Sequence, residues 1–193
     1  MATHVALLRG INLGGKNKVA MADLRGVVAG LGHADVSTYI QSGNVLFSVV
    51  PADAADTAAL AAGLTEAISV GLGVSAPVVV VSRDELAGVI AANPFPLPSE
   101  ADPKRVHAVV LSEPPGAALA GKLDAAVARA AAKGARDELA TVGRTLYLHT
   151  PGGFGNSDLS AAVLRIVSAP HAGVTGTARN WATVNKLFEL ASG

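Results

Sequence analysis

Two spacings of hydrophobic residues alternate along the first half of the chain. Short apolar runs rich in β-branched residues predict four strands, over residues 4–9, 36–41, 44–49 and 77–81. Between them, apolar side chains recur every third or fourth residue and predict two helices, on Met21, Leu24, Val27 and Leu31 and on Leu60, Leu64, Ile68 and Leu72. Ser42-Gly43 is expected to form a two-residue hairpin turn, and Asp53 to cap the second helix. The resulting β-α-β-β-α-β order is the ferredoxin-like order.

The same order of elements returns in the second half. The predicted strands lie over residues 105–111, 138–141, 145–149 and 174–177. One helix follows Pro114-Pro115 and ends near Gly134, a second begins after Ser157, and a last one runs from about Asn180 to Ala191. We therefore expect an α+β fold of two ferredoxin-like halves with antiparallel sheets, plus a connecting helix and a C-terminal helix.

A connecting segment separates the two halves. Ser82 and Glu85 form the capping-box pattern of a short helix, which Asn93-Pro94 ends. Residues 94–103 are rich in proline and in acidic side chains, which is typical of a linker. We expect an N-terminal half over residues 1–84, a connecting helix and linker over 85–103, and a C-terminal half over 104–193.

Composition narrows the functional classes. Lys+Arg and Asp+Glu number 15 each, so any anion site is a local patch and nucleic acid is disfavoured as a partner. The chain has no cysteine and only isolated histidines, so neither a metal nor another cofactor is expected. Its first residues lack the basic stretch and apolar core typical of an export signal, so none is expected, and no apolar run reaches about 20 residues. These features predict a cytoplasmic protein without a membrane partner, and they indicate no oligomeric state.

A glycine-rich loop follows the first predicted strand and matches a phosphate-binding pattern in part. Residues 10–16 have the G-x-x-x-x-G-K spacing. Position 17, however, is Asn instead of the Ser or Thr that would hold magnesium, and the first predicted helix begins several residues later. An antiparallel sheet also lacks the neighbouring parallel strand whose acidic residue holds that metal. A nucleotide hydrolase is therefore not expected.

The same loop still has the chemistry of a local anion site. Arg9, Lys16 and Lys18 lie in a stretch without an acidic residue. Gly14-Gly15 leave backbone N–H groups open to an approaching anion. The alternative is a solvated loop with ordinary surface lysines.

Polar side chains elsewhere are further candidates for the site. Asn12 lies inside the loop, and Gln41 and Asn44 bracket the first hairpin turn, where amides commonly serve the turn itself. Arg179 and Asn180 are expected to open the last helix, whose N-terminus beside an arginine is a candidate seat for an anion.

Two long motifs resemble those of a known bacterial family. They are RGINLGGKNK over residues 9–18 and TYIQSGNV over 38–45. Shorter matches follow in the same order, ANPF over 92–95, LSEPP over 111–115 and TARNWATV over 177–184. The chain resembles the domain of unknown function 1697 (DUF1697) family. The resemblance implies the two ferredoxin-like halves and brings no function with it.

Three functional hypotheses stay open. The first is a cytosolic binding or regulatory module with an anion or nucleotide site on loop 9–18, completed by Arg179 and Asn180, whose ligand is a phosphate-containing small molecule. The second is an enzyme that acts on a phosphorylated or nucleotide substrate and uses the same loop to stabilise charge. The third is RNA binding, because some ferredoxin-like sheets stack bases on aromatic side chains. The first strand has no aromatic residue and the third has only Phe47, which disfavours RNA.

Overall fold

The computed structural model describes residues 1–15, 17–49, 56–95, 102–169 and 171–193. The elements of the first half are β1 (His4–Leu8), α1 (Met21–Gly30), β2 (Ala34–Tyr39), β3 (Asn44–Ser48), α2 (Thr57–Leu72), β4 (Val78–Ser82) and α3 (Arg83–Ala91). Those of the second half are β5 (Val106–Leu111), α4 (Ala117–Ala132), β6 (Glu138–Val142), β7 (Thr145–His149), α5 (Asp158–Val167), β8 (Gly176–Asn180) and α6 (Trp181–Ser192). Short 3-10 helices precede β5 (η2, Pro103–Arg105) and α5 (η3, Phe154–Asn156).

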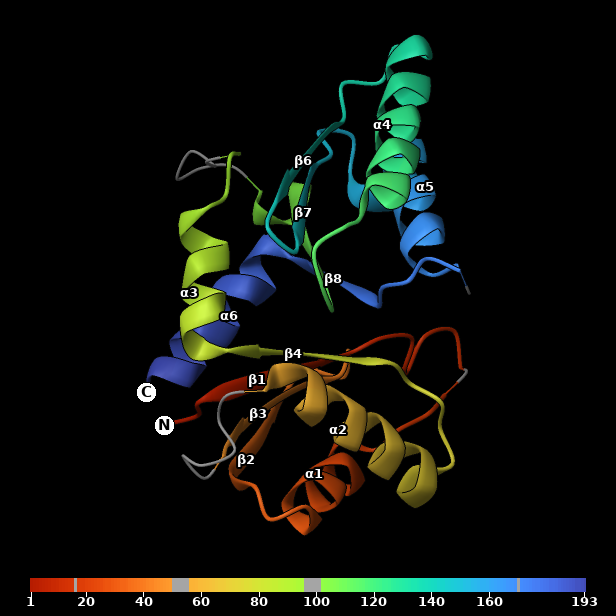
Figure 1. The fold of residues 1–193 in the computed structure, drawn as a ribbon. Coiled ribbons are helices and arrows are strands. Elements are labelled where there is room, and N and C mark those ends of the chain that lie inside the picture. The colour runs from red at the N-terminus through yellow and green to blue at the C-terminus, as the bar shows by residue number, and fades with distance from the viewer. Residues whose placement is uncertain (16, 50–55, 96–101, 170) are drawn as a thin grey trace. The chain divides into compact units, whose positions relative to one another are not determined.

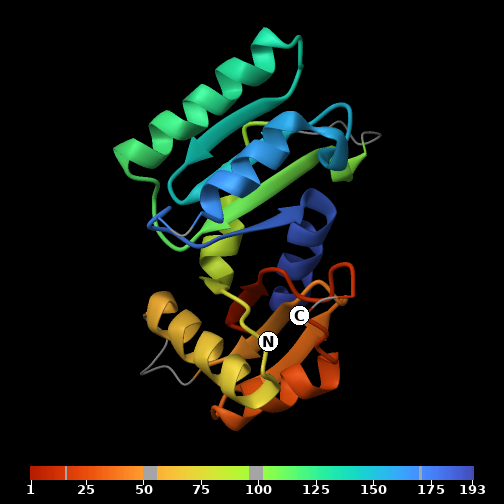
Figure 2. The same ribbon diagram turned by 90° about the vertical axis from the view of Figure 1, so that its right-hand side faces the viewer.

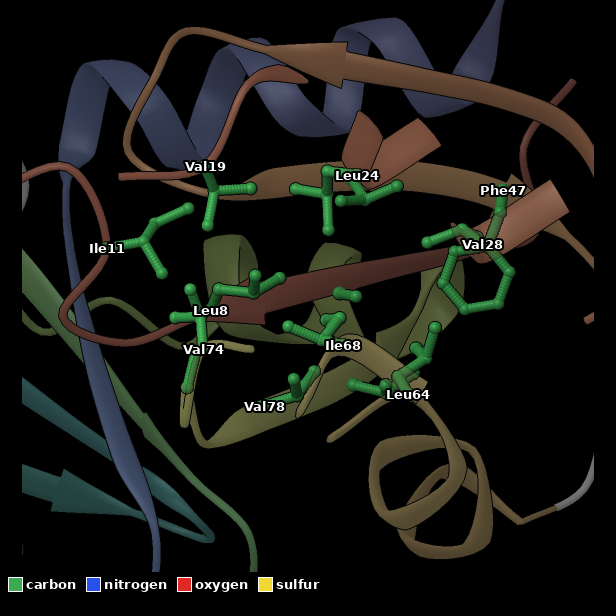
Figure 3. Packing of buried hydrophobic residues seen from close by; sticks show 14 residues of the cluster. Leu8, Ile11, Val19, Leu24, Val28, Phe47, Leu64, Ile68, Val74 and Val78 are labelled. Carbon is green, nitrogen blue, oxygen red and sulfur yellow. The ribbon is translucent and has the colours of Figure 1, made fainter. Parts of the chain in front are cut away.

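The first sheet has the strand order β2-β3-β1-β4, with every neighbouring pair antiparallel. Helices α1 and α2 cover one of its faces (Figure 1). An apolar core lies between these helices and the sheet, and part of it is labelled in Figure 3. There Leu24 and Val28 of α1 and Leu64 and Ile68 of α2 face the strands. The predicted β-α-β-β-α-β order is confirmed here.

The second sheet repeats this arrangement with the order β6-β7-β5-β8, again antiparallel throughout. Helices α4 and α5 lie side by side over one of its faces (Figure 2). Ser157 caps α5 as predicted, because its hydroxyl oxygen accepts the N–H of Ser160 at 2.9 Å. The α+β fold with two antiparallel sheets is thus confirmed.

Several local predictions were wrong. The first hairpin has a four-residue connection, since β2 ends at Tyr39, which pairs with Asn44. The buried residue in the second turn of α1 is Val28, whereas Leu31 is the exposed C-cap. The predicted cap Asp53 lies outside the described residues, and the carboxylate of Asp56 accepts the N–H groups of Ala58 and Ala59 at 2.9 and 3.0 Å.

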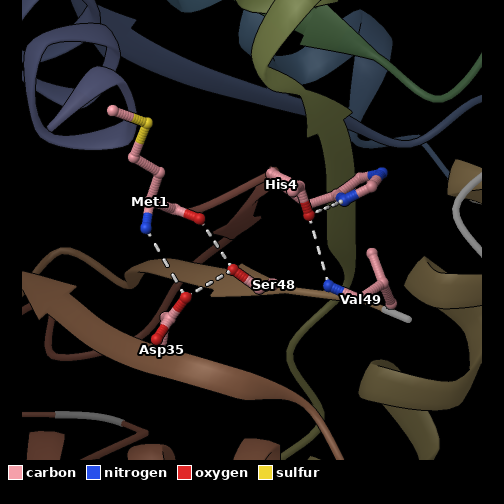
Figure 4. A network of polar contacts seen from close by, with 6 residues as sticks. Met1, His4, Asp35, Ser48 and Val49 are labelled. Atoms are coloured by element: carbon pink, nitrogen blue, oxygen red, sulfur yellow. Dashed lines mark hydrogen bonds and ion pairs between the residues drawn. The ribbon is translucent and has the colours of Figure 1, made fainter. Parts of the chain in front are cut away.

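The start of the chain is fastened to the first hairpin by a polar network (Figure 4). The hydroxyl of Ser48 donates to the carbonyl of Met1 at 2.8 Å and lies 2.9 Å from the carboxylate of Asp35. That carboxylate is also 3.6 Å from the N-terminal amine. Asp35 has a φ of 52° beside a register shift in the β2–β3 ladder. The irregularity therefore turns its side chain towards the N-terminus.

The chain divides into two compact units. The first comprises residues 1–88 together with 186–193, and the second comprises residues 89–185. Each unit has one sheet and its own apolar core. The finer boundaries expected at residues 84 and 103 stay a prediction. Within the described ranges, no helix has the length and apolar character needed to cross a membrane.

Candidate functional site

The glycine-rich loop leaves β1, and its described residues are anchored in the core near both ends. Ile11 and Val19 are buried members of the first core (Figure 3). The backbone takes positive φ values at Gly10 (75°), just before Ile11, and between Ile11 and Val19 at Asn12 (53°), Gly14 (57°), Gly15 (81°) and Asn17 (48°). Glycine and asparagine are the residues that adopt this conformation at least cost. The composition of the loop therefore follows from its geometry.

Asn12 ties the loop to itself and to the neighbouring hairpin. Its side-chain oxygen accepts the N–H of Val19 at 2.9 Å, and its amide nitrogen donates to the carbonyl of Val19 at 3.0 Å. The same nitrogen donates to the carbonyl of Gln41 at 3.0 Å. A second amide, that of Asn17, donates to the carbonyl of Gly10 at 3.0 Å. The loop is thus closed by two asparagines and joined to the β2–β3 turn.

The β2–β3 turn packs closely against the loop. The N–H of Leu8 donates to the carbonyl of Gly43 at 2.8 Å. A Cβ at Gly43 would lie 2.8 Å from both Ile11 Cδ1 and Leu8 Cβ, so only glycine fits there. In the same turn Ile40 has a φ of 49° and is half exposed. Such a backbone is costly for a β-branched residue and is typically found at functional positions.

Cationic and open backbone groups lie on the outside of this closed loop. Gly14 and Gly15 are exposed, with nothing within 4 Å of the position of a Cβ at either. Lys18 is exposed, and Arg9 is half-buried, so desolvation lowers the pKa of its guanidinium. Lys16 lies outside the described residues. The described part of the loop therefore combines accessible backbone with basic side chains on a braced support.

The two hairpin amides have different roles. Asn44 is fully buried at the start of β3, and its amide nitrogen donates to the carbonyl of Tyr39 and to the hydroxyl of Ser42, both at 3.0 Å. It serves the turn. Gln41 contributes its backbone carbonyl to Asn12, while its side chain belongs to an exposed residue. The structure therefore brings Gln41 next to the loop.

Arg179 and Asn180 are the last two residues of β8 in the second unit, and Asn180 also directly precedes the last helix, which begins at Trp181. The strand was predicted over residues 174–177, but it extends to Asn180 because residues 107–111 of β5 pair with 176–180. Arg179 is buried, donates to the hydroxyl of Thr177 and to the carbonyl of Ala178 at 2.8 Å, and has its pKa lowered to about 10 by burial. Asn180 caps α6 by accepting the N–H of Thr183 at 2.8 Å. Both side chains thus have structural partners.

The geometry bears on the chemistry that the loop can perform. Helix α1 begins only at Met21, and the neighbours of β1 are antiparallel, so the loop does not lead directly into a helix as a nucleotide-hydrolase loop does. Phe47, the aromatic side chain considered for RNA stacking, is buried in the first core. Among the described residues, no three His, Asp or Glu side chains are grouped to hold a metal ion. The loop can bind and orient a ligand through backbone N–H groups and cations.

Two features of this site were missed in the sequence. The bonds of Asn12 to Val19 and Gln41 join residues 7 and 29 positions away. Asparagine at two positions of a glycine loop indicates positive φ values, but it does not show which residues its side chain hydrogen-bonds. The conformation of Ile40 has no sequence signal, because β-branched residues are typical of strands.

Comparison with known proteins gives a family and a fold. The sequence profile of the family called "Protein of unknown function (DUF1697)" matches residues 1–147. Among solved structures, that of the conserved bacterial protein SP0830 from Streptococcus pneumoniae is similar, with a TM-score of 0.59 and 24% sequence identity over 98% of each chain. At this identity the likeness concerns the fold alone. No curated protein matches the chain.

Proposed function

The chain belongs to the DUF1697 family of proteins of unknown function, and on that premise we propose that it is a cytoplasmic binding module for a phosphate-containing small molecule. The ligand binds on the outside of loop 9–18, beside the β2–β3 turn. The observation that carries the proposal is the pair of bonds from the Asn12 amide nitrogen to Val19 and Gln41. They tie the described part of an exposed, basic glycine loop to its own C-terminal end and to the β2–β3 turn.

A braced loop supports binding for an energetic reason. Ordering a flexible loop on binding consumes part of the interaction free energy, and a loop that is already ordered avoids that loss. Gly14 and Gly15 let an anion approach the backbone closely. Lys18 adds a charge that attracts the phosphate oxygens. These groups suit a small anion.

The proposal is tested by calorimetric titration of the protein with inorganic pyrophosphate and with ADP at low ionic strength. Lys18→Ala is expected to weaken binding about fivefold, the effect of one exposed charged contact. The matched control is Lys104→Ala, which removes an exposed lysine of η2 in the second unit. Equal affinities of parent and Lys18→Ala protein, or no heat with either anion, would contradict the proposal. Release of orthophosphate during the titration would instead favour an enzyme.

A further inference from the structure

A groove runs between α4 and α5 on the outer face of the second unit. Ala126, Arg129, Ala130 and Lys133 follow one another at helical spacing on α4 and its C-cap, and Asp158, Ala161, Ala162 and Arg165 do so on α5. All line a cavity of about 410 Å³. The two stripes have the same spacing, i, i+3, i+4 and i+7, which is that of one helix face. The groove thus has an alanine floor and charged edges.

The charges at the edges of this α4–α5 groove do not balance. Lys133 forms a 2.7 Å ion pair with Asp158, and this hydrogen bond and charge lower the pKa of the carboxyl. Arg129 and Arg165 are exposed, and neither has a carboxylate within 4.0 Å in the part of the chain that the structure describes. The groove therefore has an excess of two positive charges over an apolar floor.

The side chains on the floor of the groove are small, which leaves room above them. Ala126 and Ala130 are buried, and both belong to the second core. Alanine at four floor positions lets another backbone approach closely, since the distance between packed helices depends on the side chains at the contact. A pocket of about 340 Å³ that shares Lys133 and Asp158 continues the groove beyond the ends of the helices, past Gly134 and Arg136. An elongated occupant fits this shape.

We propose that the α4–α5 groove docks an acidic amphipathic helix of a partner protein. Its apolar face would cover Ala161 and Ala162, which are more exposed than the buried alanines that α4 contributes to the groove. Its carboxylates would pair with Arg129 and Arg165, whose planar guanidinium groups bind carboxylates through two hydrogen bonds. A second copy of the groove carries the same excess of positive charge and is repelled. No aromatic side chain lines the described groove, so it has no platform for stacking nucleic-acid bases. This proposal is independent of the anion site on loop 9–18.

The test uses a synthetic helical peptide of about 15 residues, with alanine and leucine on one face and glutamate along both edges of that face. Binding to the full-length protein is measured by fluorescence anisotropy at low salt. Parent protein is expected to bind, and the double variant Arg129→Glu with Arg165→Glu to bind at least about tenfold more weakly. Arg105→Glu is the matched control, an exposed arginine of η2 outside the groove. It should bind as the parent does.

Two further measurements separate charge from shape. Ala161→Trp fills the groove without changing its charge and should also lower the affinity for the acidic peptide. A version of the peptide with lysine in place of glutamate should bind the variant Arg129→Glu with Arg165→Glu. Melting temperatures of the variants check that these exposed substitutions leave the fold intact. The proposal is overturned if the parent does not bind the acidic peptide, or if the groove variants bind it as tightly as the parent does. It is also overturned if single-stranded RNA displaces the peptide with the same dependence on Arg129 and Arg165.

Discussion

Asn12 combines a φ of 53° with three hydrogen bonds that join the loop to Val19 and Gln41. Asn12→Ala removes all three side-chain bonds. We expect unfolding free energy to fall by about 2 kcal/mol, because part of the desolvation cost of the backbone groups is no longer offset. Urea denaturation measures this. Gln41→Ala is the control, since Gln41 takes part through its backbone carbonyl, and it should leave the stability unchanged.

Gly43 and Gly15 allow close packing to be separated from backbone strain. Their φ values are 79° and 81°, but a Cβ meets Leu8 and Ile11 at 2.8 Å only at Gly43. Alanine at Gly15 is expected to cost about 1 kcal/mol through backbone strain alone. Alanine at Gly43 should cost about 2 kcal/mol more through overpacking. If thermal unfolding shows equal losses of stability in the two variants, the turn shifts to accommodate the methyl group and there is no overpacking at Gly43.

His107 is expected to make stability depend on pH. Its ring stacks on Phe154 with centroids 3.8 Å apart, its Nδ1 is buried without a hydrogen-bond partner among the residues described, and burial lowers its pKa to about 4. The unfolded chain, with a pKa near 6.5, therefore binds the proton first as pH falls. Stability should drop by roughly 2 kcal/mol between about pH 6.5 and 4, less than the full shift implies because the ring keeps some solvent contact.

The control for this pH dependence is His107→Phe, which keeps an aromatic ring at the position and has no proton to gain. The difference in stability between the two proteins, measured by urea denaturation across this pH range, isolates the histidine. Parallel curves would mean that His107 does not couple to unfolding.

At the residue scale, the anion-binding role of the loop stays a prediction. Gly14, Gly15 and Lys18 are exposed. Asn12 and Asn44 instead hold the backbone together. The difference arises because an amide has the same appearance in a sequence whether its partner is a ligand or a carbonyl distant along the chain.

Among the elements, α5 depends on a cap with two partners. The hydroxyl of Ser157 accepts the N–H of Ser160 and donates to the carboxylate of Asp137 at 2.7 Å. Ser157→Ala should lower the unfolding free energy by about 1–2 kcal/mol, in the range of lost N-caps. Ser168→Ala, at the C-cap of the same helix, is the control. Chemical denaturation that finds the two variants equal would argue against the cap.

Elements with strong periodicity were predicted closely, and those at junctions were not. Helix α2 and strand β4 lie where their apolar spacing places them. Strand β8 was placed too early because its exposed-looking residues Arg179 and Asn180 interrupt the apolar run, whereas pairing with β5 includes them. Strand pairing is a tertiary contact and outweighs local propensity.

For the whole molecule, the two separate cores predict that a cavity-creating substitution in one core destabilises its own unit and leaves the other unit stable. Leu64 belongs to the first core and Leu123 to the second, and both are almost fully buried. Leu64→Ala should cost about 2–5 kcal/mol and increase hydrogen exchange at the amides of β1 and β3, while those of β5 and β7 stay protected. Leu123→Ala should give the opposite pattern. Uniform loss of protection in either variant would mean that the units unfold as one.

The two-unit organisation was visible in the repeated order of elements, but the composition of the first unit was not. Periodicity assigns a residue to a helix, and it does not say which sheet that helix joins. Residues 186–193, which include the C-terminal part of α6, belong to the first unit although they follow the whole of the second.

This discontinuity bears on how the protein is made. A ribosome releases residues 1–88 long before residues 186–193, so the first unit lacks its last segment while the second is still being synthesised. The second unit is continuous, over residues 89–185, and can complete its contacts as soon as it emerges. The half that is translated first therefore receives its last segment only after the second unit has been synthesised.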